Sequence, residues 1–176
     1  MNSSQMNKKR HSLLKNKAKK IKMVLTDNDG VLTDTGVYYS ADGEEFKKFS
    51  IRDGMGVERL KNELNIETGI ITGETSGSIK KRAEKLQITE LFLGVKDKEN
   101  ILPIILENKN YKSENIAYIG DDVNDIKILK IAGLTACPAD AMPVIKELVD
   151  YVCEQKGGNG AFREFAELII SLNKEN

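Results

Sequence analysis

The 176-residue chain has no tryptophan, two cysteines and a single histidine, His11. Zinc sites and Ser-His-Asp triads depend on histidine, so one histidine in a lysine-rich segment argues against both. Cys137 and Cys153 lie in apolar segments and form no CxxC pair, which favours two buried thiols over a metal or redox role. Unpaired cysteines are typical of a reducing cytoplasm, where we expect this protein to work.

An excess of one charge and a long apolar run are also missing. The 27 Lys and Arg residues balance the 27 Asp and Glu residues, so the net charge predicts neither a nucleic-acid nor a membrane partner. No run approaches the ~18 apolar residues of a membrane-spanning helix, and the basic N-terminal segment lacks the apolar stretch of a signal peptide. With 40% hydrophobic and 31% charged residues, the composition is typical of one globular domain.

Lysine and arginine are concentrated at the start of the chain, between residues 8 and 22. This segment is either an arm for an acidic partner or a solvated tail or frayed helix that leads into the first strand, and we favour the second interpretation. We therefore assign residues 1–20 to a basic tail or helix and residues 21–172 to the folded domain.

Short β-branched runs alternate with longer amphipathic runs along the rest of the chain. This alternation predicts an α/β domain with a mostly parallel sheet that helices cover on both faces. Ligands of such sheets bind beyond the carboxyl ends of the strands, so we expect functional residues directly after strands. The predicted strands are Ile21–Thr26, Gly69–Thr72, Leu91–Leu93, Ile116–Ile119, Leu134–Cys137 and Tyr151–Val152, and the predicted helices are Gly54–Asn65, Ser76–Leu86, Lys98–Asn108, Val123–Ile131, Pro143–Leu148 and Ala161–Leu172.

Two segments interrupt the alternation. Gly36–Ile51 has two extended runs on either side of Asp42-Gly43, which predicts a β-hairpin inserted at residues 36–51. The run Gly157-Gly158-Asn159-Gly160 separates the last strand from the last helix.

Asp27 and Asp29 follow the first predicted strand, two residues apart. If the extended geometry continues, their carboxylates lie on one face and repel each other unless a cation or a proton lies between them. Mg²⁺ suits this position because it takes oxygen ligands and keeps several waters, whereas a calcium loop would need its glycine in sixth place and Gly30 is fourth. The alternative is a polar turn in which Gly30 supplies a positive φ.

A second acidic group follows the predicted strand Ile116–Ile119. It consists of Asp121, Asp122 and Asp125. Acidic residues also cap helix N-termini, but three carboxylates in five residues exceed what a cap needs. A metal site between the two acidic groups would explain both.

Thr72 ends the predicted strand Gly69–Thr72 in front of Gly73, and Lys98 follows the predicted strand Leu91–Leu93. A hydroxyl and an ammonium in these places could hold and neutralise a phosphoryl group, although each alone is more commonly a turn threonine or a surface lysine. The chain therefore has four motifs in order at the ends of successive strands: Asp-x-Asp, Thr, Lys and Gly-Asp-Asp. In this order and placement it resembles the haloacid dehalogenase superfamily of phosphatases over about Ile21–Leu168.

Three further runs resemble one branch of that superfamily, the capless branch that acts on 2-keto-3-deoxy sugar-acid phosphates. They are Asp27–Asp34, Arg52–Gly56 beside the hairpin, and Gly157–Glu164. The interval between Asp29 and Thr72 has room for the hairpin and one helix but for no cap domain. The resemblance implies a single Rossmann-like domain with a hairpin insertion and an open active site.

The resemblance also implies roles for the matched residues. Asp27 would be the nucleophile that forms an aspartyl-phosphate, and Asp29 would protonate the leaving group and then take a proton from water. Mg²⁺ would be bound by the Asp27 carboxylate, the Asp29 carbonyl and Asp121. Thr72 and Lys98 would stabilise the transferring phosphoryl group. Two further carboxylates would orient Lys98 and the metal-bound waters, namely Asp122 and Asp125.

Substrate and partners are implied in the same way. In this branch four chains join through their hairpins and a neighbouring chain closes each site, which implies a homotetramer. Octulosonate 8-phosphate phosphatases usually carry Arg after the Thr-Gly pair, whereas Glu74 follows Gly73 here, which is closer to the enzymes for the nine-carbon KDN 9-phosphate. The implied substrate-binding residues are Arg52, Gly73 and Glu74 together with Arg82 and Lys85 of a neighbouring chain, although the last two could instead form a solvated helix face.

Other classes stay open at this point. The chain could be a phosphate-responsive binding module that holds an aspartyl-phosphate without turnover, but Asp29 supplies an acid and base that such a module does not need. It could be a non-catalytic assembly partner, although the complete residue set argues against decay. It could also be a phosphatase for another small phosphate ester.

Overall fold

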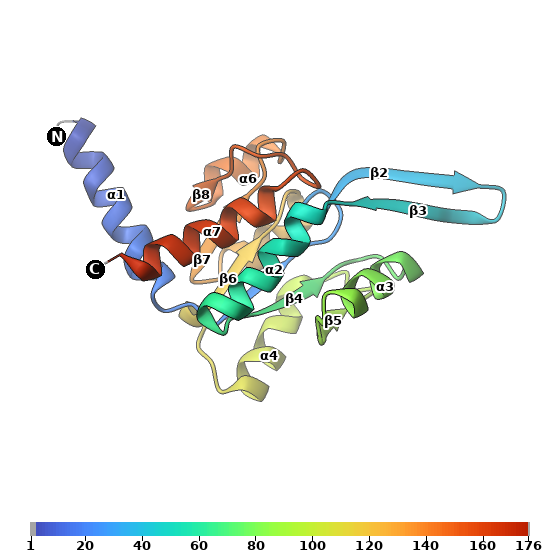
Figure 1. The fold of residues 1–176 in the computed structure, drawn as a ribbon, viewed down its shortest axis with the longest axis horizontal. Coiled ribbons are helices and arrows are strands. Elements are labelled where there is room, and N and C mark those ends of the chain that lie inside the picture. Colours follow the sequence, from blue (N-terminus) through green and yellow to red (C-terminus); the bar gives the residue numbers. More distant parts are fainter. Residues whose placement is uncertain (1–2, 176) are drawn as a thin grey trace.

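In the computed structural model, which describes residues 3–175, the centre of the domain is a six-stranded sheet (Figure 1). The strand order is β5-β4-β1-β6-β7-β8, and every neighbouring pair is parallel. The α/β prediction is therefore confirmed. The strands are β1 Met23–Thr26, β4 Glu67–Ile71, β5 Glu90–Phe92, β6 Ile116–Ile119, β7 Leu134–Cys137 and β8 Tyr151–Val152.

The strand order places a topological switch point beside β1. The chain runs outward from β1 through β4 to β5, and then returns to the other side of β1 to form β6, β7 and β8. In sheets of this kind, the crevice outside the carboxyl ends of the strands at the switch point is the usual ligand site. Here that crevice lies between the ends of β1 and β6.

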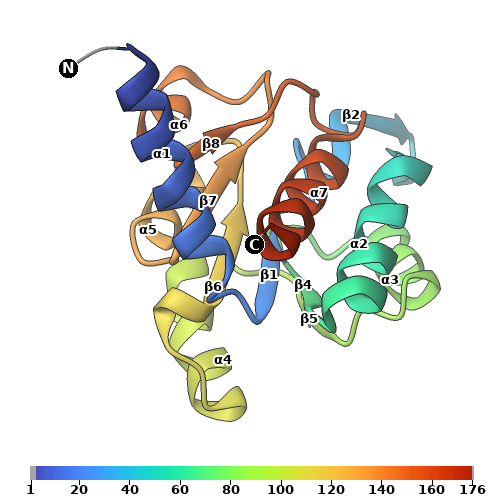
Figure 2. The same ribbon diagram turned by 60° about the vertical axis from the view of Figure 1, so that its left-hand side comes forward.

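Helices cover both faces of the sheet because alternate strand residues point to opposite sides. Ala117 and Ile119 of β6 join one apolar core, and Tyr118 joins the other. The first core packs mainly under α2 and α7, and the second under α4, α5 and α6 (Figure 2). The helices are α1 Ser3–Ala18, α2 Ile51–Leu64, α3 Gly77–Lys85, α4 Ile101–Lys109, α5 Ile126–Leu129, α6 Pro143–Leu148 and α7 Ala161–Lys174, with 3-10 turns η1 Lys98–Asn100, η2 Ser113–Asn115 and η3 Val123–Asp125.

Helix α2 begins three residues before its predicted start at Gly54. The Ser50 hydroxyl accepts hydrogen bonds from the backbone N–H groups of Arg52 and Asp53, at 3.1 and 3.4 Å. A serine that satisfies the free N–H groups of the first turn is a strong helix start. The helix ends at Leu64, and its C-terminal cap Asn65 adopts the left-handed conformation with φ 54°, as such caps commonly do.

The predicted hairpin is present and extends away from the sheet (Figure 1). It consists of β2 Thr33–Ser40 and β3 Gly43–Phe49, so its first strand begins three residues before the predicted residue 36. Gly43 closes the ladder opposite Ser40 with a φ of 116°, a conformation that favours glycine.

The basic N-terminal segment forms helix α1. Its last turns are held on the domain because Leu14 and Ala18 are buried in the first core, while Lys17 forms an ion pair with Asp150. Residues 1 and 2 of the predicted tail lie outside the described residues, and the domain division at residue 20 stays a prediction. Among residues 3–175, the helices are too short or too polar to cross a membrane.

Candidate active site

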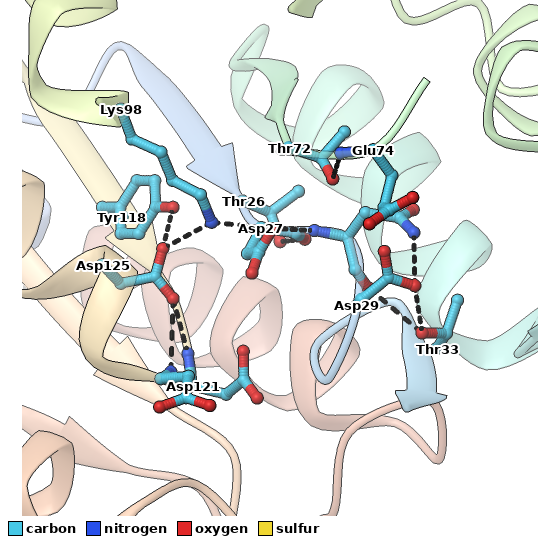
Figure 3. Close-up of polar contacts among 12 residues, drawn as sticks. Thr26, Asp27, Asp29, Thr33, Thr72, Glu74, Lys98, Tyr118, Asp121 and Asp125 are labelled. Carbon is cyan, nitrogen blue, oxygen red and sulfur yellow. Dashed lines mark hydrogen bonds and ion pairs between the residues drawn. The ribbon is translucent and has the colours of Figure 1, made fainter. Parts of the chain in front are cut away.

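Most of the residues that the sequence singled out meet in one cleft at the carboxyl ends of β1, β4 and β6. The cleft has a volume of about 330 Å³. Figure 3 shows the side chains that converge on it. The lining residues are Asp27, Asp29, Thr35, Thr72, Gly73, Glu74, Asp121, Asp122, Val123 and Asn124.

The loop after β1 turns tightly around the Asn28 carbonyl. That oxygen accepts the N–H groups of Leu32 and Thr33 at 2.9 and 3.1 Å. Gly30 has a φ of 92°, and a Cβ atom there would lie 2.0 Å from Asp121 Oδ2. Any larger residue would therefore push the two acidic groups apart, which explains why this loop needs glycine.

A second glycine-rich loop packs behind the first. The Gly158 N–H donates to the Val31 carbonyl at 2.9 Å, and a Cβ on Gly157 would lie 1.9 Å from the Gly30 oxygen. The buried Asp53 carboxylate of α2 accepts the N–H groups of Gly160 and of the first turn of α7 at 3.1 and 3.0 Å. The loop before α7 thus supports the loop that carries Asp27.

Asp125 is the centre of a buried polar network. Its Oδ1 accepts hydrogen bonds from Lys98 Nζ at 2.7 Å and from the Tyr118 hydroxyl at 2.6 Å, and its Oδ2 accepts the Asp121 N–H at 3.0 Å (Figure 3). Lys98 also lies 2.8 Å from Asp27 Oδ1. Burial lowers the pKa of the Lys98 amine, but the charges of the two carboxylates outweigh it and the net pKa is raised. The lysine therefore stays an ammonium beside Asp27.

The acidic group fits a divalent cation. Carboxylate oxygens of Asp27, Asp121 and Asp125 lie within 4.8 Å of one another. Asp121 Oδ1 is buried and has no hydrogen-bond partner within residues 3–175, unlike the oxygens of Asp125. Burial and then the charges of the other carboxylates raise the pKa of Asp121 to about 8, and burial followed by Asp125 raises that of Asp27 to about 7. A cation would relieve this repulsion, and oxygen donors suit Mg²⁺.

Asp29 has two oxygens in different surroundings. Its Oδ1 accepts hydrogen bonds from Lys47 Nζ at 2.7 Å and from Thr33 Oγ1 and Asn28 Nδ2 at 3.2 Å each. Its Oδ2 is buried and has no hydrogen-bond partner in the described part of the chain. Burial lowers the pKa of the Lys47 amine, but the hydrogen bond and charge of Asp29 and the charge of Glu44 outweigh it, so the net pKa is raised.

Thr72 stands at the opposite wall from Asp121. It is buried, and its hydroxyl accepts the Glu74 N–H at 3.1 Å, which leaves the hydroxyl hydrogen free to donate into the cleft. Gly73 and Glu74 continue this wall. Thr72 and Glu74 therefore line the same cleft as Asp27 and Asp29, while their roles stay predictions.

Several predicted residues lie elsewhere or have another contact. Arg82 donates to the Ser50 carbonyl at 2.7 Å and lies over the Phe49 ring, and Lys85 lines a separate groove between α2 and α3. Arg52, on the first turn of α2, is not among the residues that line the cleft of this chain. The Asp122 carboxylate lines the cleft but accepts the N–H of Val123 at 2.6 Å, so it caps η3, and its role toward metal-bound waters stays a prediction.

The sequence did not indicate three residues of the site. Tyr118 was part of a predicted strand, Thr35 lies between the run Asp27–Asp34 and the predicted hairpin, and Lys47 was one of two adjacent lysines in the hairpin. A tyrosine in an otherwise aliphatic buried strand was the one available signal, because a buried hydroxyl requires a polar partner.

Comparisons with known proteins relate the chain to a family of hydrolases. A family model of haloacid dehalogenase-like hydrolases matches residues 7–165. The 3-deoxy-D-manno-octulosonate 8-phosphate phosphatase KdsC of Haemophilus influenzae is 37% identical over 157 residues, which cover 89% of this chain and 87% of that protein. The cobalt-bound deoxy-D-mannose-octulosonate 8-phosphate phosphatase of the same organism has a TM-score of 0.86 at 37% identity, covering 89% of this chain and 91% of that one. The Moraxella catarrhalis 3-deoxy-D-manno-octulosonate 8-phosphate phosphatase, in complex with magnesium ion, phosphate ion and KDO, has a TM-score of 0.86 at 35% identity, covering 90% and 91%.

Proposed function

The chain belongs to the haloacid dehalogenase-like hydrolase family and is a phosphatase, and we propose that it is Mg²⁺-dependent and works through an aspartyl-phosphate on Asp27. One observation carries this proposal. Asp27, Thr72 and Asp121 follow three different strands and meet in one cleft, with Lys98 bonded to Asp27. Convergence of a nucleophile, a metal-ligand set and phosphate-binding groups is what phosphoryl transfer requires.

The proposed reaction has two steps. An Asp27 oxygen attacks phosphorus, the bond from phosphorus to the leaving oxygen breaks, and Asp29 gives that oxygen a proton. Asp29 then accepts a proton from the water that attacks the aspartyl-phosphate, which releases inorganic phosphate and restores Asp27. Lys98 and the Thr72 hydroxyl donate to the phosphoryl oxygens and stabilise their charge.

The Asp27 and Asp121 carboxylates and the Asp29 carbonyl would hold Mg²⁺, which when bound would offset the repulsion between the phosphate and the attacking carboxylate. The buried Asp121 Oδ1, which has no hydrogen-bond partner among residues 3–175, supports this ligand assignment. Asp125, whose two oxygens accept hydrogen bonds from the protein, would hold Lys98 in place.

We propose a 2-keto-3-deoxy sugar-acid phosphate as the substrate. The names of the similar phosphatases favour the eight-carbon 3-deoxy-D-manno-octulosonate 8-phosphate. Glu74 favours the nine-carbon KDN 9-phosphate as the second candidate, because it lines the cleft where octulosonate phosphatases usually carry arginine. Replacing Glu74 by Arg should therefore change the preference between the two esters, and unchanged kinetics on both would argue against a specificity role.

We also propose a homotetramer that forms through the hairpins. Tyr38, Tyr39 and Phe46 of the hairpin are 63%, 73% and 64% exposed, and a lone two-stranded hairpin is at best marginally stable in water. A neighbouring chain would cover these rings and bring its Arg82 and Lys85 toward the open cleft. Light scattering at micromolar protein tests this, and a monomer would contradict it.

Phosphate release from the two sugar-acid phosphates, with Mg²⁺ and with EDTA, tests the function. Asp27→Asn should lose turnover while it keeps the circular dichroism spectrum of the wild type. Turnover that survives EDTA or the Asp27 substitution would contradict the proposed mechanism. The ratio of kcat/KM values would identify the substrate, and turnover of neither ester by folded protein would point to a different phosphate ester.

A further inference from the structure

The two oxygens of Asp29 are held unequally. Oδ1 accepts hydrogen bonds from three side chains, Lys47, Thr33 and Asn28, and the shortest of these is the 2.7 Å bond from the lysine. Oδ2 is buried and accepts none within residues 3–175, and Asp29 lines the cleft. A carboxylate anchored through one oxygen keeps the other oxygen clear of competing hydrogen bonds, so that this oxygen can carry the proton.

Lys47 reaches this carboxylate from the hairpin rather than from the sheet. Its side chain is 1% exposed, and besides Asp29 it lies 3.6 Å from Glu44 Oε2. The other oxygen of Glu44 lies 3.4 Å from the hydroxyl of Ser78 on α3. The hairpin is thus connected to the active-site loop through Lys47 and to α3 through Glu44.

Burying a lysine requires compensation, which the two carboxylates provide. A purely structural ion pair would work equally well with any acidic residue near β3. Here one of the two partners of Lys47 is Asp29, the carboxylate that the proposed reaction uses for proton transfer. The lysine donates to only one of the two Asp29 oxygens, Oδ1. The pairing therefore bears on catalysis as well as on the position of the hairpin.

From this geometry we infer that Lys47 is a positioning residue, which fixes the Asp29 carboxylate so that Oδ2 delivers the proton to the leaving oxygen. This inference rests on the proposed function. The proton moves from Oδ2 to the leaving oxygen as the bond from phosphorus to that oxygen breaks, and Lys47 itself transfers none. Without the ammonium, Asp29 Oδ1 keeps only the hydrogen bonds from Thr33 and Asn28, at 3.2 Å each, so the carboxylate is held less firmly and the proton donor is misplaced.

The leaving group supplies the test. An alkyl phosphate needs a proton on its leaving oxygen, whereas p-nitrophenolate leaves readily as an anion. General acid catalysis contributes roughly 10²–10⁴-fold, so Lys47→Met should lower kcat/KM for the sugar-acid phosphate by about 10- to 100-fold and for p-nitrophenyl phosphate by less than about threefold. The parameter kcat/KM is chosen because it reports steps up to formation of the aspartyl-phosphate and excludes the water step that both esters share.

Three further variants separate positioning from a general structural effect. Lys48→Met is the matched control, because Lys48 is adjacent and exposed and pairs with Asp34 outside the cleft; it should leave both esters unchanged. Lys47→Arg keeps the cation and should restore much of the alkyl phosphate activity. In an Asp29→Asn background, Lys47→Met should add less than about a twofold loss, because coupled residues are not additive.

An equal loss for both esters, or no loss for either, would overturn the inference. If Lys47→Met does not keep the wild-type circular dichroism spectrum, Lys47→Gln takes its place in the same comparison. If the wild type turns over a different alkyl phosphate, that ester replaces the sugar-acid phosphate. Asp27→Asn is the separate test of the proposed function, so inactive Asp27→Asn with equal losses in Lys47→Met would reject only the role of Lys47.

Discussion

Removal of Mg²⁺ should make the stability of this protein depend on pH. In the metal-free protein the pKa of Asp27 is raised to about 7 and that of Asp121 to about 8, from an ordinary value of 3.8, and burial is the largest cause of both shifts. The folded chain therefore holds protons that the unfolded chain has already lost. The stabilising contribution of these two protonated carboxyl groups is fully present below about pH 4 and is lost as the pH rises through their folded pKa values.

The magnitude follows from the size of the shifts. Each group lowers the unfolding free energy by ~1.4 kcal/mol per pH unit between its unfolded and folded pKa values. From about pH 5.5 to about pH 8, the two groups together lower the stability of the metal-free protein by roughly 5 kcal/mol. Bound Mg²⁺ favours the charged carboxylates and removes most of this slope, so its stabilising effect should be much larger at the higher pH.

Urea unfolding measures this directly, with EDTA and with saturating Mg²⁺ across that pH range. Asp53 also has a pKa raised by burial, but it contributes to both arms and cancels in the difference between them. Asp121→Asn removes one titrating ligand and should reduce both the slope and the gain from Mg²⁺. A gain from Mg²⁺ that is the same at every pH would refute the reasoning, because it would mean that the cation binds away from these carboxylates.

Three substitutions test other parts of the structure. Asp125→Asn leaves the buried Lys98 with one charged partner fewer, so the unfolding free energy should fall by about 3 kcal/mol in urea titrations and kcat by on the order of 100-fold in phosphate-release assays. Ser50→Ala removes the N-cap of α2 and should cost about 1 kcal/mol in the same titrations, with kcat within about twofold of wild type. Gly157→Ala would place a Cβ atom 1.9 Å from the Gly30 oxygen, so kcat should fall and the melting temperature should drop, and unchanged values would show that the loop behind Asp27 can move at little cost.

The site was largely predictable because its residues directly follow strands. In a parallel sheet the carboxyl ends of all strands meet at one edge, so local patterns were enough to bring Asp27, Thr72 and Asp121 together. Details set by hydrogen bonding were harder to predict. Lys98 opens a 3-10 turn ahead of α4, and Ser50 moves the start of α2 forward, because capping side chains and tertiary contacts decide where a helix begins.

The hairpin side of the cleft could not be predicted from local patterns. Thr35 lines the cleft with a φ of 65°, a conformation that is unusual for a β-branched residue. It lies where the β2–β3 register is irregular between Thr33 and Val37, and such irregularities bend a strand and redirect its side chains. Strand propensity alone gives no indication of an irregularity at this place.

The choice between Lys47 and Lys48 shows the same limit most clearly. Alternation along β3 puts the two lysines on opposite faces, but it does not say which face turns toward the sheet. That is decided by the direction in which the hairpin leaves the domain, and hence by the irregularity after Thr33 and by the contact of Glu44 with α3. Because these determinants are far apart in the sequence, one lysine is buried against Asp29 while its neighbour pairs with Asp34 at the surface. Exchanging the charges of Lys47 and Asp29 would therefore not be equivalent to exchanging those of Lys48 and Asp34, since only the first pair places its carboxylate in the cleft.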